Sequence, residues 1–163
     1  MRLTLWKTLA ISALLAAPAL AAAVGSAPAA DYPHPGTVMV PTKHKFDALL
    51  TRIEKAIADN GMGLVAQASA SRGAAARGVK IPGNAVIEVF RNDYAVRMLA
   101  ASVPAGFEAP LRLYVTENPD KTATVVYRLP SAVFAPYGNA QLDAMARELD
   151  PIFEKIVSDS AGK

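Results

Sequence analysis

Two stretches of the chain have the hydrophobic spacing of an amphipathic helix. In the first, residues 46–57, apolar side chains recur three or four positions apart with charged residues between them. These apolar positions are Phe46, Leu49, Leu50, Ile53 and Ile57. Thr42 stands where a helix N-cap belongs, and Gly61 stands where the helix would end. The pattern predicts a helix with one face buried against another layer.

The second helical stretch begins near Asn139, which we expect to be its N-cap, and its apolar stripe runs to Ile156. Pro151 interrupts this stripe, and a proline inside a helix removes a hydrogen bond. We therefore expect either a kink or two abutting helices at that point. Asn92 is expected to cap a shorter helical piece.

Short runs rich in apolar and β-branched residues predict five strands. They cover residues 38–40, 64–69, 85–91, 111–117 and 122–129. Pro41 ends the first run, which favours a place at the edge of a sheet. The segment between the second and third strands is expected to be a long loop or a short helical turn. The last two strands flank the turn residues 118–121 and predict a hairpin.

The hairpin also predicts a register, because paired residues point to the same face of a sheet. The apolar positions match in the pairs Leu113–Tyr127 and Val115–Val125, facing the core. The opposite face then holds Arg112 opposite Arg128, with Tyr114 and Val126 beside them.

The order strand, helix, four strands, helix predicts a two-layer α+β sandwich with a mainly antiparallel sheet. We expect a single domain over residues 38–160, preceded by an extended linker at residues 31–37, where two prolines and a glycine occur.

Residues 1–30 have the three parts of a secretory signal peptide: the cations Arg2 and Lys7, an apolar stretch at residues 9–20, and small residues at the candidate cleavage sites. Cleavage is expected after Ala21, Ala29 or Ala30. The alternative is an uncleaved membrane anchor, which the prolines and the alanine-rich composition disfavour. We therefore expect a periplasmic or secreted protein with no stable membrane insertion after cleavage.

The composition excludes several classes of protein and of partner. The chain of 163 residues is 52% hydrophobic, which excludes intrinsic disorder, and it has no cysteine, which excludes disulfides and thiolate chemistry. Of the 17 basic residues, removal of Arg2 and Lys7 leaves 15 against 14 acidic ones, a net charge of +1. Nucleic-acid binding requires a concentrated basic surface, so we expect no nucleic-acid partner.

The residues that could carry chemistry are few. Neither His34 nor His44 lies near a carboxylate cluster with the spacing of metal ligands, so we expect no metal. No serine stands in the Gly-x-Ser-x-Gly arrangement of a hydrolase nucleophile, and no motif for a cofactor is present.

One cluster of charges could form a site. Two arginines directly opposite each other on a sheet repel, so Arg112 and Arg128 invite an anion between them. Glu88 lies in the middle of a predicted strand and could supply that anion as an internal ion pair. The alternatives are a bound carboxylate or phosphate ligand near Tyr114, or a different register.

Three functions remain open. The first is a non-catalytic exported module that binds a small anionic molecule or a protein partner on the sheet face. The second is a homodimer through that face, with Tyr114, Val126 and Arg128 at the contact. The third is a hydrolase or isomerase that uses Glu88 as acid or base. Nearby arginines would lower the pKa that this role needs raised, which argues against an enzyme.

The sequence also resembles a known family. The matching segments are residues 42–47, Gly61, Gly78 with Ile81-Pro82, residues 90–93 and residues 109–112. They resemble the bacterial family called domain of unknown function 302 (DUF 302), over residues 36–158. This resemblance implies a curved antiparallel sheet backed by two helices, similar to the TATA-box-binding-protein-like arrangement, and it implies no established activity.

The chain departs from the family pattern at two places. An Asp-His pair followed by Asn-Ala is common in the family after the second strand; this chain has Ser69, Ala70, Gly73 and Ala74 there. A Phe-Gly-Asn-Pro turn is replaced by Phe-Arg-Asn-Asp at residues 90–93, which keeps Asn92 as a candidate ligand-binding residue.

Overall fold

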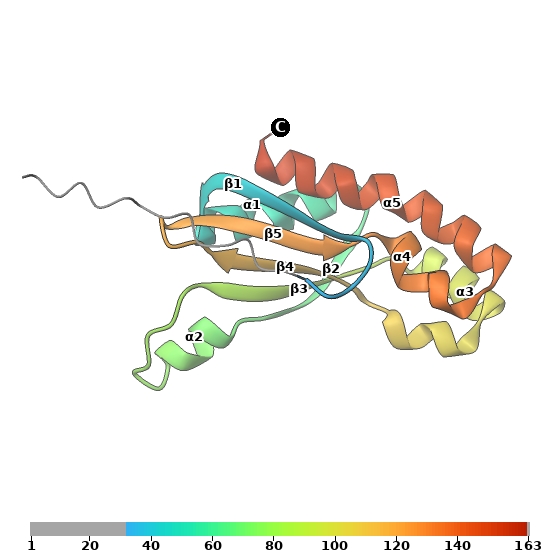
Figure 1. Cartoon of the computed structure of the whole chain (residues 1–163), viewed down its shortest axis with the longest axis horizontal. Helices are drawn as coiled ribbons and strands as arrows, with labels where there is room; N and C mark the ends of the chain where they lie inside the picture. The colour runs from blue at the N-terminus through green and yellow to red at the C-terminus, as the bar shows by residue number, and fades with distance from the viewer. Residues whose placement is uncertain (1–31, 163) are drawn as a thin grey trace, which may run out of the picture. The chain divides into compact units, whose positions relative to one another are not determined.

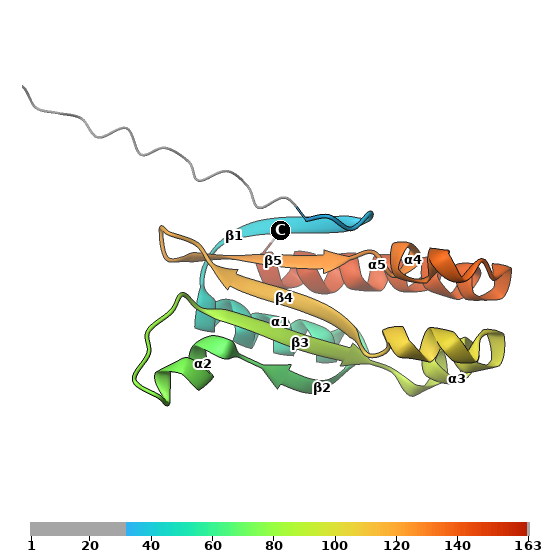
Figure 2. The same ribbon diagram turned by 60° about the horizontal axis from the view of Figure 1, so that its bottom comes forward.

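The computed structural model describes residues 32–162. Five strands form one antiparallel sheet in the order β1-β5-β4-β3-β2, which Figure 2 shows from one edge to the other. The strands are β1 (Thr37–Lys45), β2 (Gly63–Ala68), β3 (Asn84–Phe90), β4 (Leu111–Glu117) and β5 (Thr122–Arg128). The predicted signal peptide lies outside the described residues.

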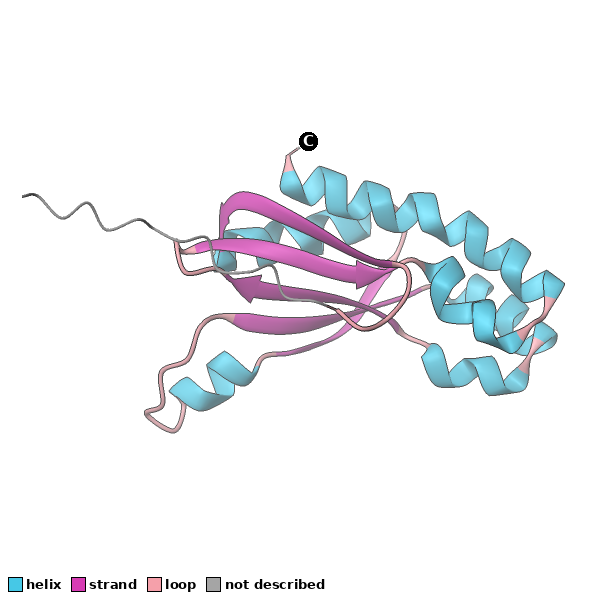
Figure 3. Cartoon of the chain, in the orientation of Figure 1, coloured by secondary structure: helices cyan, strands magenta, loops and turns pink. Residues whose placement is uncertain are grey.

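Helices α1 (Phe46–Asp59) and α5 (Ala140–Ala161) cover one face of this sheet (Figure 1). We call the other face the open face. Figure 3 shows the strands as one sheet, with helices behind it and at its two ends. This arrangement confirms the predicted two-layer α+β sandwich and its order of main elements.

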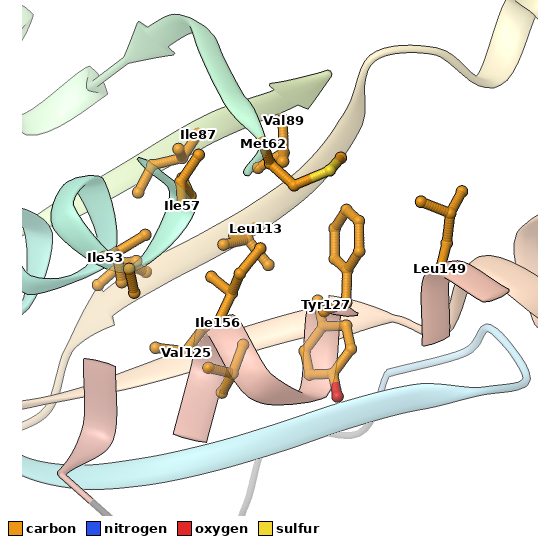
Figure 4. Packing of buried hydrophobic residues seen from close by; sticks show 14 of the residues in the cluster. Ile53, Ile57, Met62, Ile87, Val89, Leu113, Val125, Tyr127, Leu149 and Ile156 are labelled. Atoms are coloured by element: carbon orange, nitrogen blue, oxygen red, sulfur yellow. The ribbon is translucent and has the colours of Figure 1, made fainter. Parts of the chain in front are cut away.

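The core lies between the sheet and the two helices, because each contributes one apolar face. Figure 4 shows Ile53 and Ile57 of α1 beside strand residues Ile87 and Leu113, with Ile156 of α5 nearby. All five are fully or almost fully buried. The five apolar positions that predicted the first helix are all buried as well.

The predicted register of the hairpin is confirmed. Leu113 pairs with Tyr127, and Val115 pairs with Val125. All four side chains belong to the core cluster. The turn is held by Asp120, whose carboxylate accepts hydrogen bonds from both the backbone N–H and the hydroxyl of Thr122.

The first strand is longer than the sequence predicted, and the assignment of Thr42 as an N-cap is wrong. Strand β1 continues past Pro41 to Lys45, which is itself the N-cap of α1. Because β1 is an edge strand, a proline within it leaves the rest of the sheet intact. The hydroxyl of Thr42 donates instead to the carbonyl oxygen of Ala123 on β5, at 2.8 Å, where the pairing shifts.

Asn139 caps α5 as predicted, since its side-chain oxygen accepts from the backbone N–H groups of Gln141 and Leu142. The helix runs through Pro151 as one element, so the alternative of two abutting helices is wrong. The assignment of Asn92 as a cap is also wrong: Arg91 is the N-cap, and Asn92 is the first helical residue.

Shorter helices lie at the two ends of the sheet in both views (Figures 1 and 2). One end carries α2, and the other end carries α3, α4 and the 3-10 helices η1 and η2. Their bounds are α2 (Ala70–Ala75), α3 (Asn92–Ala101), η1 (Val103–Glu108), α4 (Pro130–Phe134) and η2 (Ala135–Tyr137). In residues 32–162, no helix combines the length and the apolar character needed to cross a bilayer.

Residues 32–36, which we call the strap, turn back across the open face before β1 begins (Figure 1). The turn is made at Gly36, which has a φ of 73° and whose carbonyl oxygen accepts from the N–H of Leu129 at 2.9 Å. The hydroxyl of Thr37 donates to the carbonyl oxygen of His34. These contacts hold the strap against the sheet, in a segment that the sequence predicted only as an extended linker.

Candidate ligand-binding site

A cavity of about 340 Å³ lies between the strap and the open face. This volume falls in the range of small-molecule sites, roughly 300–1,000 Å³. Its lining combines the strap residues Tyr32 and His34 with Thr37, Val86, Glu108, Leu111, Arg112, Tyr114, Val126, Tyr127, Arg128 and Val133.

The open-face side chains of the lining come in two neighbouring rows, because residues two apart on a strand share a face. The first row is charged. Arg112 of β4 pairs with Glu88 of β3, and Arg128 of β5 pairs with Thr37 of β1. The β4–β5 register, which pairs Leu113 with Tyr127, brings the two arginine positions side by side.

The second row is apolar and aromatic. Tyr114 stands between Val86 on β3 and Val126 on β5, and Met39 on β1 completes the row. Val126 is only 4% exposed, although it lies on the face away from α1 and α5. The cavity therefore has a cationic end and an apolar floor.

The guanidinium of Arg128 is held by one hydrogen bond to the described part of the protein. Its Nη2 donates to the carbonyl oxygen of Ala132 in α4, at 3.0 Å. Its Nε is buried and has no hydrogen-bond partner among the described residues. A buried N–H without an acceptor costs free energy, so the guanidinium has unused capacity to donate.

Arg112 is exposed, and within residues 32–162 it has no ion-pair or hydrogen-bond partner. Glu88 faces it across the two strands, yet the two charged groups form no ion pair within 4 Å. The internal ion pair that the sequence suggested is therefore not formed in the described part of the chain.

Two phenol groups lie at the apolar part of the cavity. Burial raises the pKa of Tyr32, and the nearby hydroxyl of Tyr114 adds to this effect. At the edge of the cavity, Glu108 accepts a hydrogen bond from the hydroxyl of Tyr137 at 3.1 Å, and burial together with this bond raises the pKa of Tyr137. The phenols of Tyr32 and Tyr137 are therefore neutral hydrogen-bonding groups at ordinary pH.

The structure brings three of the five candidate residues into one cavity: Arg112, Tyr114 and Arg128. Glu88 is beside Arg112 on the sheet but is not part of the lining. Asn92 begins α3, after the end of β3, and does not line the cavity.

Sequence reasoning missed the strap residues and the residues of α4 and η1. Tyr32 was hidden in a segment interpreted as a linker, and Val133 lies in a helix too short to show periodicity. Gly36 was the usable signal, because a glycine just before a strand is typical of a tight turn with positive φ.

Three other features of residues 32–162 bear on possible chemistry. No group of three or more potential metal-ligating His, Cys, Asp or Glu side chains occurs in residues 32–162. A second cavity, near Arg91 and Tyr94, holds only about 30 Å³ and is lined almost entirely by apolar residues such as Met62 and Met145. Ser69, one of the positions that depart from the family pattern, caps α2 by accepting from the N–H of Arg72.

These features define a small α+β domain with a strap and a cavity on the open face of its sheet. The family model named "Domain of unknown function DUF302" matches residues 38–159, and the chain belongs to this family. It is similar to a solved structure titled "Crystal structure of uncharacterized conserved protein DUF302 from Bacillus stearothermophilus".

That similarity has a TM-score of 0.69 at 17% identity, and it covers 77% of this chain and 98% of the other. At this identity the likeness shows the shared fold alone. No curated protein matches the chain significantly.

Proposed function

We propose that this domain is a non-catalytic module that binds a small anionic ligand in the cavity beneath the strap. One observation carries the proposal: two arginines, neither paired with a carboxylate in the described chain, share a cavity of ligand size. Arginine guanidinium groups suit carboxylates and phosphates because their N–H groups bond two oxygens at once.

The arrangement of the charges supports binding rather than catalysis. An enzyme that used Glu88 as acid or base would need this carboxyl group within reach of the ligand. Glu88 does not line the cavity; it stands opposite Arg112 on the neighbouring strand.

A homodimer through the open face is the second candidate, and the strap argues against it. Val126, which would lie at the contact, is already buried within one chain, with only 4% of its surface exposed. The strap also occupies the area that a second copy would need. We propose further that the module acts outside the cytoplasm, in the periplasm or the medium, on the basis of the signal-peptide pattern in residues 1–30.

The test is thermal unfolding of the purified chain with and without small carboxylates and inorganic phosphate. A ligand at a hundred times its Kd adds about 2.7 kcal/mol of stability, which raises Tm by on the order of 10 °C in a domain of this size. Arg112→Ala should remove the shift. Arg77→Ala, in an exposed loop position without a side-chain partner in the described chain, should keep it.

The absence of a shift with every anion would refute the proposal. So would equal shifts for the wild-type protein and Arg112→Ala. Arg112 is the better position to change, because Arg128 also donates to α4 and its loss would disturb the fold.

A further inference from the structure

We infer that the ligand is a carboxylic acid with an apolar body, bound with its carboxylate at the arginines and its body along the second row. This inference rests on the proposed function and specifies the chemical class of the ligand.

The two rows set the length of the ligand. Residues two apart on a strand are separated by about 7 Å, so this distance separates Arg112 from Tyr114 and Arg128 from Val126. A molecule that reaches both rows must extend beyond its charged group by about that distance. Formate, acetate and inorganic phosphate are too small to do so.

The second row offers little to a polar molecule. Val86 and Val126 have no polar side-chain atoms, and Tyr32 and Tyr114 each combine a largely apolar ring with one hydroxyl. Each methylene group buried there tightens binding by about fourfold, the equivalent of 0.8 kcal/mol. A sugar phosphate would lose hydrogen bonds to water on this floor without replacing them.

The carboxylates near the cavity favour a single negative charge. Glu108 lies in the lining, and Glu88 stands beside Arg112. Two arginines balanced by two carboxylates at the margin leave no excess positive charge to offset a second negative charge on the ligand, so a monoanion held by the guanidinium N–H groups is favoured over a phosphate dianion. The charge balance therefore agrees with the shape of the cavity in selecting a carboxylic acid.

The experiment is isothermal titration of the full chain with hexanoate, acetate, inorganic phosphate and the neutral hexanamide. We expect hexanoate to bind at least tenfold more tightly than acetate or phosphate, because its four additional methylenes lie on the second row. We expect hexanamide to bind at least tenfold more weakly than hexanoate, because it lacks the charge that the arginines recognise.

A matched pair of variants tests the position of the apolar body. Val86→Thr keeps the side-chain shape and adds a hydroxyl to the cavity floor, so hexanoate should bind about fivefold to tenfold more weakly while acetate is unchanged. Val65→Thr makes the same change at a 52% exposed position of β2 outside the cavity, and it should leave both affinities unchanged.

The results separate this inference from the proposed function. If acetate or phosphate binds as tightly as hexanoate, or if Val86→Thr has no effect on hexanoate, the inference is wrong and the anion site stands. If hexanamide binds as tightly as hexanoate, or if no compound binds, both are wrong.

Discussion

Glu88 and Arg112 are paired in register on strands β3 and β4, but their charged groups do not form an ion pair within the described chain. Exposed ion pairs contribute only about 0–1 kcal/mol, because water solvates both partners well. Leaving Arg112 unpaired therefore costs little stability. It leaves the guanidinium available to an anion from outside the chain.

This relationship predicts the effect of neutralising the carboxylate. Glu88→Gln removes a negative charge next to the proposed anion site, so hexanoate should bind about twofold to fivefold more tightly at low ionic strength. Added salt should reduce the difference. Titration calorimetry of Glu88→Gln and of Glu54→Gln, an exposed position on α1, measures the effect against a matched control. Loss of binding in Glu88→Gln would mean that Glu88 itself holds the ligand or the arginine.

The attachment of the strap depends on Gly36. An added Cβ there would overlap the Cβ of Ala132 in α4, and the φ of 73° is unfavourable for any other residue. Gly36→Ala should lower the free energy of unfolding by about 2–4 kcal/mol, from backbone strain together with overpacking. Chemical denaturation measures this change.

Gly78→Ala is the control for the backbone term alone. Gly78 has a similar φ of 75°, and a Cβ there would meet no atom within 4 Å. Its substitution should cost only about 1 kcal/mol. Equal losses for the two variants would show that the strap is not packed against α4.

Two leucines in strands should differ greatly in the unfolding free energy that is lost when each is replaced by alanine. Leu113 is fully buried between the sheet and α1, whereas Leu64 is 39% exposed on β2. Leu113→Ala should cost about 2–5 kcal/mol of unfolding free energy, because it loses apolar burial and leaves a cavity. Leu64→Ala should cost less than about 1 kcal/mol. A similar cost for both would contradict the layer arrangement.

The pH dependence of stability should reflect Glu117. Its carboxylate accepts from the N–H of Gly83 at 2.8 Å and lies 3.1 Å from the Nζ of Lys121, and these contacts lower its pKa below 4.5. A carboxyl group whose pKa is lower in the folded state stabilises that state above its unfolded pKa, and this contribution is lost as the pH falls through the folded pKa.

Denaturation of the wild-type protein between pH 7 and pH 2 should therefore show stability falling below about pH 4.5. In Glu117→Gln this fall should be smaller, and stability at pH 7 should be lower. Glu54→Gln should follow the wild-type curve. If stability falls as steeply at low pH in Glu117→Gln as in the wild-type protein, the role given to this carboxylate is contradicted.

Much of the fold could be predicted from the sequence because it depends on local periodicity. The buried stripe that ends at Ile57 and the alternation around Leu113 are each set by residues close together in the chain. The hairpin register followed from matching apolar positions on two adjacent strands. The same matching predicts Arg112 and Arg128 on one face of the sheet.

The rest depends on contacts between distant parts of the chain. Threonine commonly caps helices, but the pairing of β1 with β5 extends the strand past Thr42. Tyr32 and Val133 meet the same cavity although a hundred residues separate them. Local patterns carry no information about such contacts, so only Arg112, Tyr114, Val126 and Arg128 of the lining were predicted.

The most direct test of the account is the affinity of hexanoate for the wild-type chain, Arg112→Ala and Arg77→Ala, measured by titration calorimetry at one salt concentration. We expect Arg112→Ala to bind hexanoate at least tenfold more weakly than the wild-type chain, consistent with the loss of a hydrogen bond to a charged group. Arg77→Ala should bind like the wild-type protein. Equal affinity in all three proteins would contradict the claim that unpaired arginines on the open face hold an anion.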